Sequence, residues 1–137
     1  MKHKKTIDLI VERSDDGYWV SVQGLPGCYS FGKNISDALK NTREAIDEHV
    51  KGLNESSDKI PEEFLSGDFE FSVHYDVMSL FEAFPVINKT VLARYAGINA
   101  SLLRQYSKGL AYAGSRQRYK IQQALHRIGK ELLQANL

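Results

Sequence analysis

The sequence contains a single cysteine, Cys28, among 137 residues, so an internal disulfide is excluded. No apolar run approaches the roughly 20 residues that a helix needs to cross a bilayer. No apolar segment follows the Met-Lys-His-Lys-Lys start, as a secretory leader would require. These absences predict a protein of the reducing cytoplasm with no membrane partner.

Acidic residues are missing from one long stretch of the chain. No Asp or Glu occurs from Ala83 to Lys130, although this stretch carries nine Lys or Arg. Residues 1–85 hold 9 basic and 16 acidic side chains, net −7, whereas residues 86–137 hold 9 basic and 1 acidic, net +8. A basic module attracts polyanions and an acidic module attracts basic proteins. The charge distribution therefore predicts two domains, at residues 1–76 and 77–137, with different partners.

The acidic half has the pattern of a small sheet with one helix, in the order β-β-β-α-β. Residues 6–12 and 18–23 alternate apolar and polar side chains around a Ser-Asp-Asp-Gly turn, which is typical of a hairpin with one buried face. A short third strand is predicted at residues 28–31 and a last strand at residues 69–75. A helix is predicted from an N-cap at Ser36, since apolar residues then recur at helical spacing.

The basic half is predicted to be all helical. Helix starts are indicated by a capping-box pattern at Ser79 and by cap residues at Asn88, Asn99 and Ser115. The second and third helices are predicted to stop at glycines, Gly97 and Gly109. The last helix carries an apolar stripe at helical spacing, formed by Ile121, Ala124, Leu125, Ile128 and Leu132.

The second and third of these helices, from Leu92 to Gly109, resemble the helix-turn-helix of the lambda-repressor-like family. Leu103 and Tyr106 share a buried face in the pattern, so Arg104 and Gln105 point outward. Arg and Gln suit guanine and adenine edges, and Lys suits phosphate. The predicted DNA-binding residues are Lys89, Asn99, Ala100, Ser101, Arg104, Gln105, Lys108 and Arg116. A helical hairpin that only packs, and an RNA-binding bundle without sequence preference, are the alternatives.

The acidic half resembles the HicB antitoxin pattern. The resemblance is carried by Asp-Gly-Tyr-Trp-Val-Ser-Val at 16–22, Leu-Pro-Gly-Cys-Tyr-Ser-Phe-Gly at 25–32, Ser-Asp-Ala-Leu at 36–39 and Glu-Ala-Ile at 44–46. It implies a truncated RNase H-like domain that blocks HicA, a small basic toxin that cleaves mRNA. It also implies that the helix-turn-helix represses the operon. The overall fold class is then α+β, with the sheet domain followed by an all-α DNA-binding domain.

Candidate toxin-binding residues combine aromatic and acidic side chains of the first half: Trp19, Tyr29, Phe31, Glu44 and Glu48. In a small sheet most aromatic side chains are expected to be core. Trp19 lies on the face opposite Tyr18 and Val20, so it is either covered by the 54–68 loop or offered to a partner, for which Trp is a preferred anchor.

No catalytic or metal site is predicted. Asp8 is the only carboxylate on a strand position that suggests a metal-dependent nuclease, and Asp15 and Asp16 belong to a turn. Cys28 could act as a nucleophile with His49 or His74, but a lone cysteine among aromatic residues is more often a small buried apolar residue. The histidines have no ligand spacing. We therefore expect a protein that is not an enzyme and has no cofactor.

Repression of a two-fold operator is expected to need a homodimer or a higher homo-oligomer, because one short helix contacts too little DNA. The partners predicted are thus a HicA-type toxin, double-stranded operator DNA and further copies of the chain. Two other functions stay open. One is a solitary transcription regulator whose N-terminal domain binds a ligand or dimerises, and the other is a residual nuclease.

Overall fold

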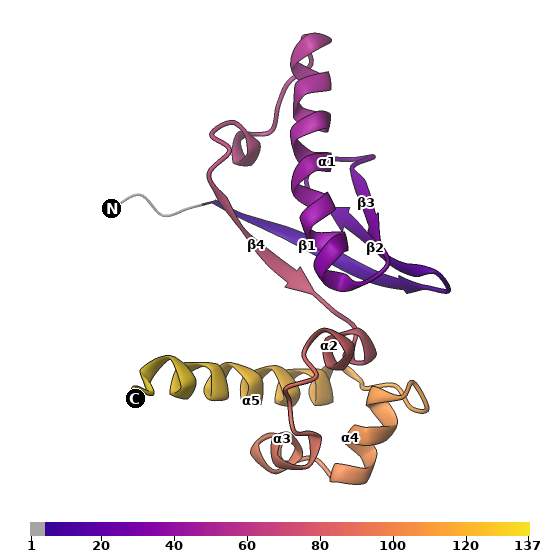
Figure 1. The fold of residues 1–137 in the computed structure, drawn as a ribbon, viewed down its shortest axis with the longest axis vertical. Helices are drawn as coiled ribbons and strands as arrows, with labels where there is room; N and C mark the ends of the chain where they lie inside the picture. The colour runs from indigo at the N-terminus through magenta and orange to yellow at the C-terminus, as the bar shows by residue number, and fades with distance from the viewer. Residues whose placement is uncertain (1–4) are drawn as a thin grey trace. The chain divides into compact units, whose positions relative to one another are not determined.

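The computed structural model describes residues 5–137. The chain divides into two compact units, Met1–Asp76 and Val77–Leu137. A four-stranded sheet with one long helix forms the first unit, and helices form the second (Figure 1). The predicted α+β class is therefore confirmed. Within the described residues, no helix has both the length and the apolar character to cross a membrane.

The sheet of the first unit has the strand order β3-β2-β1-β4. Its strands are β1 (Lys5–Ser14), β2 (Gly17–Val22), β3 (Tyr29–Gly32) and β4 (Phe69–His74). The first three strands are antiparallel neighbours, whereas β4 returns parallel to β1. A parallel return requires a crossover, and the helix between β3 and β4 provides it. All four predicted strands are present, with ends that differ by at most two residues.

Helix α1 (Ile35–Glu55) covers one face of this sheet (Figure 1). The alternating apolar residues of β1 and β2 point to it and are at most 9% exposed: Ile7, Leu9, Val11, Tyr18, Val20 and Val22. The predicted N-cap at Ser36 is wrong. Asn34 is the cap, and its side chain accepts a hydrogen bond from the Asp37 amide at 2.8 Å. Both residues are favourable caps, and the path of the chain out of β3 selects the earlier one.

Strand β3 and α1 approach each other closely at Gly32. A Cβ atom added there would collide with the backbone of Ala38, so only glycine fits this position. Beside this contact, the buried hydroxyls of Ser30 and Thr42 lie 2.6 Å apart, and Thr42 donates to the Ala38 carbonyl at 2.7 Å. Two polar side chains are thereby buried without an unsatisfied group.

The second unit consists of α2 (Val77–Ala83), α3 (Lys89–Ala96), α4 (Ala100–Ser107) and α5 (Ser115–Gln134). Its core is formed by Phe81, Leu92, Ala93, Ala96, Ile98, Leu103, Tyr106, Ile121 and Ala124. Two predicted starts are wrong. Helix α2 begins at Val77, so Ser79 lies inside it and is buried, and the cap of α5 is Gly114 rather than Ser115.

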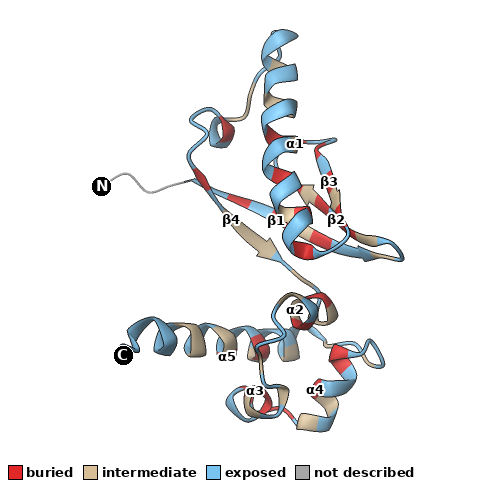
Figure 2. Ribbon diagram, in the orientation of Figure 1, coloured by how far each residue is buried: buried red, intermediate tan, exposed pale blue. Residues whose placement is uncertain are grey.

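The apolar stripe of α5 is only partly buried (Figure 2). Ile121 and Ala124 are 3% exposed, whereas Leu132 is 69% exposed. Helix α5 has 20 residues and its main neighbour α3 has 8, which correspond to about 30 Å and about 12 Å of helix. Leu132 is exposed because α5 extends past the helices that cover its start.

Candidate functional site

The sheet face opposite α1 carries the exposed aromatic residues of the first unit. Trp19 on β2 is directly opposite Phe31 on β3, and their ring centroids are 5.0 Å apart. Tyr29 projects from the same face, two residues before Phe31. Trp19 is 49% and Tyr29 is 61% exposed. The expectation that most of these aromatic residues are core is wrong for Tyr29, because alternation along β3 turns Ser30 and Gly32 toward α1 instead.

An acidic residue continues the aromatic row. Glu12 on β1 is the cross-strand partner of Trp19, so Glu12, Trp19 and Phe31 form one row across three strands. A hollow of about 620 Å³ adjoins this row. It is lined by Ile10, Glu12, Trp19, Ser21, Tyr29 and the turn of residues 22–28. A carboxylate beside an exposed indole suits a cationic side chain, which gains charge attraction and cation–π contact. Glu12 was not among the candidates predicted from the sequence, although its alternation with Val11 indicated that it lies on the open face.

The two acidic candidates on α1 are not part of this row. Glu44 lines a second hollow of about 420 Å³ at the free edge of β3, together with Phe31, Lys40 and Asn41. There the Asn41 side-chain amide donates to the Phe31 carbonyl at 2.7 Å and occupies part of the strand edge. Glu48 is exposed one turn further along α1. Glu44 and Phe31 therefore line the same hollow, whereas Glu48 lies apart from the aromatic face.

Two of the residues considered for catalysis, Asp8 and Cys28, have settings that the structure describes. Asp8 Oδ1 lies 3.1 Å from His74 Nε2 on the open face, and this pair joins β1 to β4. Across residues 5–137 no group of three or more His, Cys, Asp or Glu is arranged to hold a metal ion. Cys28 is 3% exposed, and burial raises the pKa of its thiol. A raised pKa disfavours the thiolate that a nucleophile needs.

In the second unit, α3 and α4 are joined by a tight turn. Asn88 caps α3, and Gly97 ends it with φ 68°, a left-handed conformation that glycine adopts without strain. Ile98 is buried in the turn, and the Asn99 side chain then accepts from the Ser101 amide at 2.9 Å to start α4. The predicted caps Asn88 and Asn99 and the predicted stop at Gly97 are confirmed. Asn99 therefore has a structural role in addition to any contact it makes.

The outward face of α4 is polar and basic. Ser101, Arg104, Gln105 and Lys108 are exposed, Ala100 is half-buried, and Leu103 and Tyr106 face the core. Arg104 donates to Thr90 Oγ1 at 3.3 Å, so its guanidinium group spans from α4 to the first turn of α3. Thr90 was not predicted from the sequence, because only the packing of α3 on α4 brings positions 90 and 104 together.

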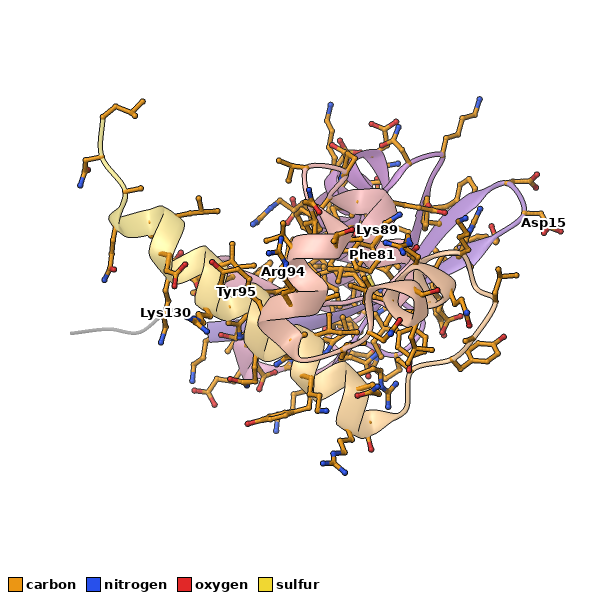
Figure 3. The ribbon with its side chains drawn as sticks, turned by 90° about the horizontal axis from the view of Figure 1, so that it is seen from below. Asp15, Phe81, Lys89, Arg94, Tyr95 and Lys130 are labelled. Atoms are coloured by element: carbon orange, nitrogen blue, oxygen red, sulfur yellow. The ribbon has the colours of Figure 1, made fainter. Side chains whose placement is uncertain are left out.

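The remaining two predicted DNA-binding residues lie at helix starts. Lys89, the first residue of α3, is half-buried, and its ammonium group lies 5.5 Å from the centre of the Phe81 ring (Figure 3). Arg116 is exposed in the first turn of α5. A cation over an aromatic ring loses part of its freedom but keeps its charge. Lys89 is therefore held near the start of α3 rather than extended into solvent.

These observations define a two-unit α+β protein with an acidic sheet unit and a basic helical unit. A family model described as the HicB-like antitoxin of bacterial toxin-antitoxin systems matches residues 7–107. The match covers most of the chain, from β1 to the end of α4. The chain belongs to this family of antitoxins.

Individual relatives match shorter segments. An uncharacterized 14.9 kDa protein from the rep-hol intergenic region of Haemophilus phage HP1 is 42% identical over 53 residues, which are 39% of this chain and 40% of the phage protein. A UPF0150 protein of Thermoplasma acidophilum is 41% identical over 54 residues, 39% of this chain and 78% of the relative. A UPF0150 protein of Helicobacter pylori is 38% identical over 47 residues, 34% of this chain and 65% of the relative. The chain thus spans less than half of the phage relative.

Proposed function

We propose that this antitoxin neutralises a small basic HicA-type mRNA interferase with its first unit and represses its own operon with its second. The observation that carries the proposal is the segregation of charge by unit: residues 1–76 hold 9 basic and 15 acidic side chains, net −6, and residues 77–137 hold 9 basic and 2 acidic, net +7. An antitoxin has a toxin as its partner, and an mRNA-cleaving toxin needs a basic surface to hold its substrate. The acidic unit is the half that such a surface attracts.

The open sheet face is the proposed toxin-binding surface. Interface hot spots are enriched in Trp, Tyr and Arg, and Trp19 and Tyr29 are both about half exposed or more on this face. Glu12 stands beside Trp19 and complements a toxin Lys or Arg. The strand order with β4 parallel to β1 and a helix on one face supports the proposed kinship to half of an RNase H-like sheet. In this proposal the sheet acts as a binding surface and not as a nuclease.

The α3–α4 pair is the proposed helix-turn-helix, with α4 as the recognition helix. Its exposed face combines groups that read base edges, Arg104 and Gln105, with groups that bind phosphate, Ser101 and Lys108. The start of α3 adds Lys89 and the start of α5 adds Arg116, while Thr90 of α3 holds the Arg104 side chain. Among residues 77–137 the only acidic side chains are Glu82 and Glu131, so repulsion of DNA is confined to two positions.

Growth rescue tests the toxin part of the proposal. The full chain and a small basic toxin from the same operon are expressed from separate promoters, and growth is scored. We expect the toxin alone to arrest growth and the full chain to relieve the arrest. Trp19→Glu should abolish relief, whereas Tyr112→Glu should not, because Tyr112 is a 95% exposed aromatic residue of the other unit. Relief by both variants alike would contradict the sheet face as the binding surface.

DNA binding tests the repressor part. Fluorescence anisotropy of the full chain is measured with operon promoter DNA and with random DNA of equal length, at two salt concentrations. We expect tighter binding to the promoter and weaker binding to both as salt rises. Equal affinity for the two sequences would point to the alternative of a nucleic-acid-binding bundle without sequence preference.

A further inference from the structure

The loop of residues 108–114, which joins α4 to α5, has its apolar side chains in an unusual order (Figure 1). Leu110 is 74% and Tyr112 is 95% exposed, whereas the small residues Ala111 and Ala113 pack against the core of the unit. Burial of a large apolar side chain stabilises a fold far more than burial of a single methyl group. Stability alone would favour the reverse order. The exposed pair therefore suits a contact outside the chain.

Both ends of this loop are fixed to the helices that it joins. The Leu110 amide donates to the Gln105 carbonyl at 2.9 Å, which places Leu110 against the last turn of α4. Gly114 is the N-cap of α5, and its carbonyl accepts from the Arg118 amide at 2.9 Å. The two exposed side chains are thus presented from an ordered loop, which lowers the entropy cost of binding.

The charge around the loop favours a polyanion as the partner. Lys108 precedes the exposed pair, Arg116 and Arg118 follow it, and all three are exposed. No Asp or Glu occurs in residues 83–130. Interfaces between proteins are depleted of charged residues at their centre, whereas DNA attracts basic side chains to its phosphates. The loop also continues directly from α4, the proposed recognition helix, so its position and its charge both favour DNA.

We propose that Leu110 and Tyr112 contact the methyl groups of thymines beside the base pairs that α4 reads. The thymine methyl is an apolar group on the major-groove edge of the bases, and apolar side chains contact it. Because Leu110 adjoins the last turn of α4, a helix seated in the groove brings the loop to the neighbouring base pairs. Sequence discrimination then extends past Arg104 and Gln105. This inference deepens the proposed repressor role and rests on it.

Uracil in place of thymine removes the proposed contact from the DNA and leaves the protein unchanged. Fluorescence anisotropy of the full chain is measured on promoter DNA made with thymine and on the same sequence made with uracil. We expect the unaltered chain to bind the uracil DNA at least about fourfold more weakly, the effect of withdrawing one methyl group from an apolar contact. Leu110→Ala and Tyr112→Ala should weaken binding to thymine DNA and reduce the difference between the two DNAs.

Two further variants serve as controls. Leu133 is an 87% exposed leucine of the same unit that lies outside the loop, so Leu133→Ala should keep the full difference between the two DNAs. Tyr112→Phe keeps the aromatic ring and should keep the difference as well. Because Leu110 and Tyr112 are exposed, neither alanine variant should change the circular dichroism of the chain. Both alanine variants should also still relieve the toxin arrest.

Equal binding of the unaltered chain to thymine and uracil DNA would overturn the inference. An equal loss on both DNAs in the two alanine variants would also overturn it, because the loop would then contact phosphate or sugar. If both alanine variants kept the full difference, the exposed pair would be left for a protein partner and the inference would again be wrong. Equal affinity of the unaltered chain for promoter and random thymine DNA would instead count against the proposed repressor role.

Discussion

Arg104 of α4 donates a hydrogen bond to the hydroxyl of Thr90 at the start of α3, with Nη1 and Oγ1 3.3 Å apart. The two residues are fourteen positions apart in the sequence and are joined only by the packing of the two helices. The bond holds an exposed and otherwise flexible guanidinium group at a defined place on the basic surface. The Arg104 side chain is therefore already ordered in the free protein, so DNA binding costs less conformational entropy. This is the general advantage of a preorganised site.

Thr90→Val should reduce sequence discrimination without unfolding the chain. Valine keeps the shape of threonine but cannot accept the hydrogen bond from Arg104. We expect affinity for promoter DNA to fall by about 0.5–1.5 kcal/mol, the usual worth of one hydrogen bond, with little change on random DNA. Thr90→Ser should restore discrimination. Equal loss on both DNAs would show that Thr90 acts as a phosphate contact and not through Arg104.

Arg104→Ala and Lys108→Ala should have different signatures. Removing the base-reading Arg104 should cost about 1–3 kcal/mol on the promoter and relax one base position. Removing Lys108 should weaken binding to all sequences alike and reduce the salt dependence. Anisotropy titrations on promoter DNA, single-base variants and random DNA measure both effects. If the two mutants lost affinity equally on every DNA, Arg104 would not read a base.

The Trp19–Phe31 pair should contribute measurably to the stability of the sheet. Ring pairs at this separation are worth about 0.5–1.5 kcal/mol beyond their buried area. A double-mutant cycle of Trp19→Ala and Phe31→Ala, followed by circular dichroism during chemical unfolding, should return a coupling energy in that range. A coupling energy near zero would mean that the two rings are placed for a partner and contribute nothing to the fold.

Gly32→Ala should strongly destabilise the first unit, whereas Gly52→Ala should stabilise it slightly. An alanine Cβ at position 32 collides with the Ala38 backbone, which cannot move without displacing α1 from the sheet. We expect a loss of about 3 kcal/mol or more for Gly32→Ala and a gain of about 0.5–1 kcal/mol for Gly52→Ala. Trp19 is the single tryptophan, so its fluorescence during denaturation reports on this unit. Similar stability of the two variants would contradict the close approach of β3 to α1.

Alkaline pH should destabilise the first unit through Cys28. Burial raises the pKa of its thiol above 9.0, so the folded state holds the proton more tightly than the unfolded state. The neutral thiol contributes fully to the free energy of unfolding below pH 9. This contribution is lost as pH rises through the raised pKa, at up to about 1.4 kcal/mol per pH unit. Burial also raises the pKa of Tyr75 above 10.0, which adds in the same direction. Cys28→Ala should flatten the fall in stability between pH 9 and 10.

Local patterns accounted for most of the elements. The alternation of Ile7, Leu9 and Val11 predicted β1, and the caps Asn88 and Asn99 predicted the starts of α3 and α4, because these signals act within a few residues. The errors at Ser36 and Ser115 share one cause. Several neighbouring residues can cap a helix, and the direction from which the chain arrives decides which one does.

The candidate sites were predicted less completely. Arg104, Gln105 and Lys108 could be placed on an outward face because helical periodicity alone separates them from Leu103 and Tyr106. Tyr29 could not be placed, since four residues of β3 are too few to show which side of the sheet they occupy. Glu48 was selected as a toxin-binding candidate and Glu12 was not, because only the pairing of β1 with β2 places Glu12 beside Trp19.

By itself the sequence determined the order of the elements, the opposite charges of the two halves and the polar face of α4. These follow from composition, alternation and capping, which are properties of short segments. The tertiary structure alone decided that Glu12 joins Trp19, that Arg104 reaches Thr90 and that Gly32 meets Ala38. It also decided that Leu132 stays uncovered. Each of these depends on which distant segments lie side by side, and that choice is made by the packing of the whole unit.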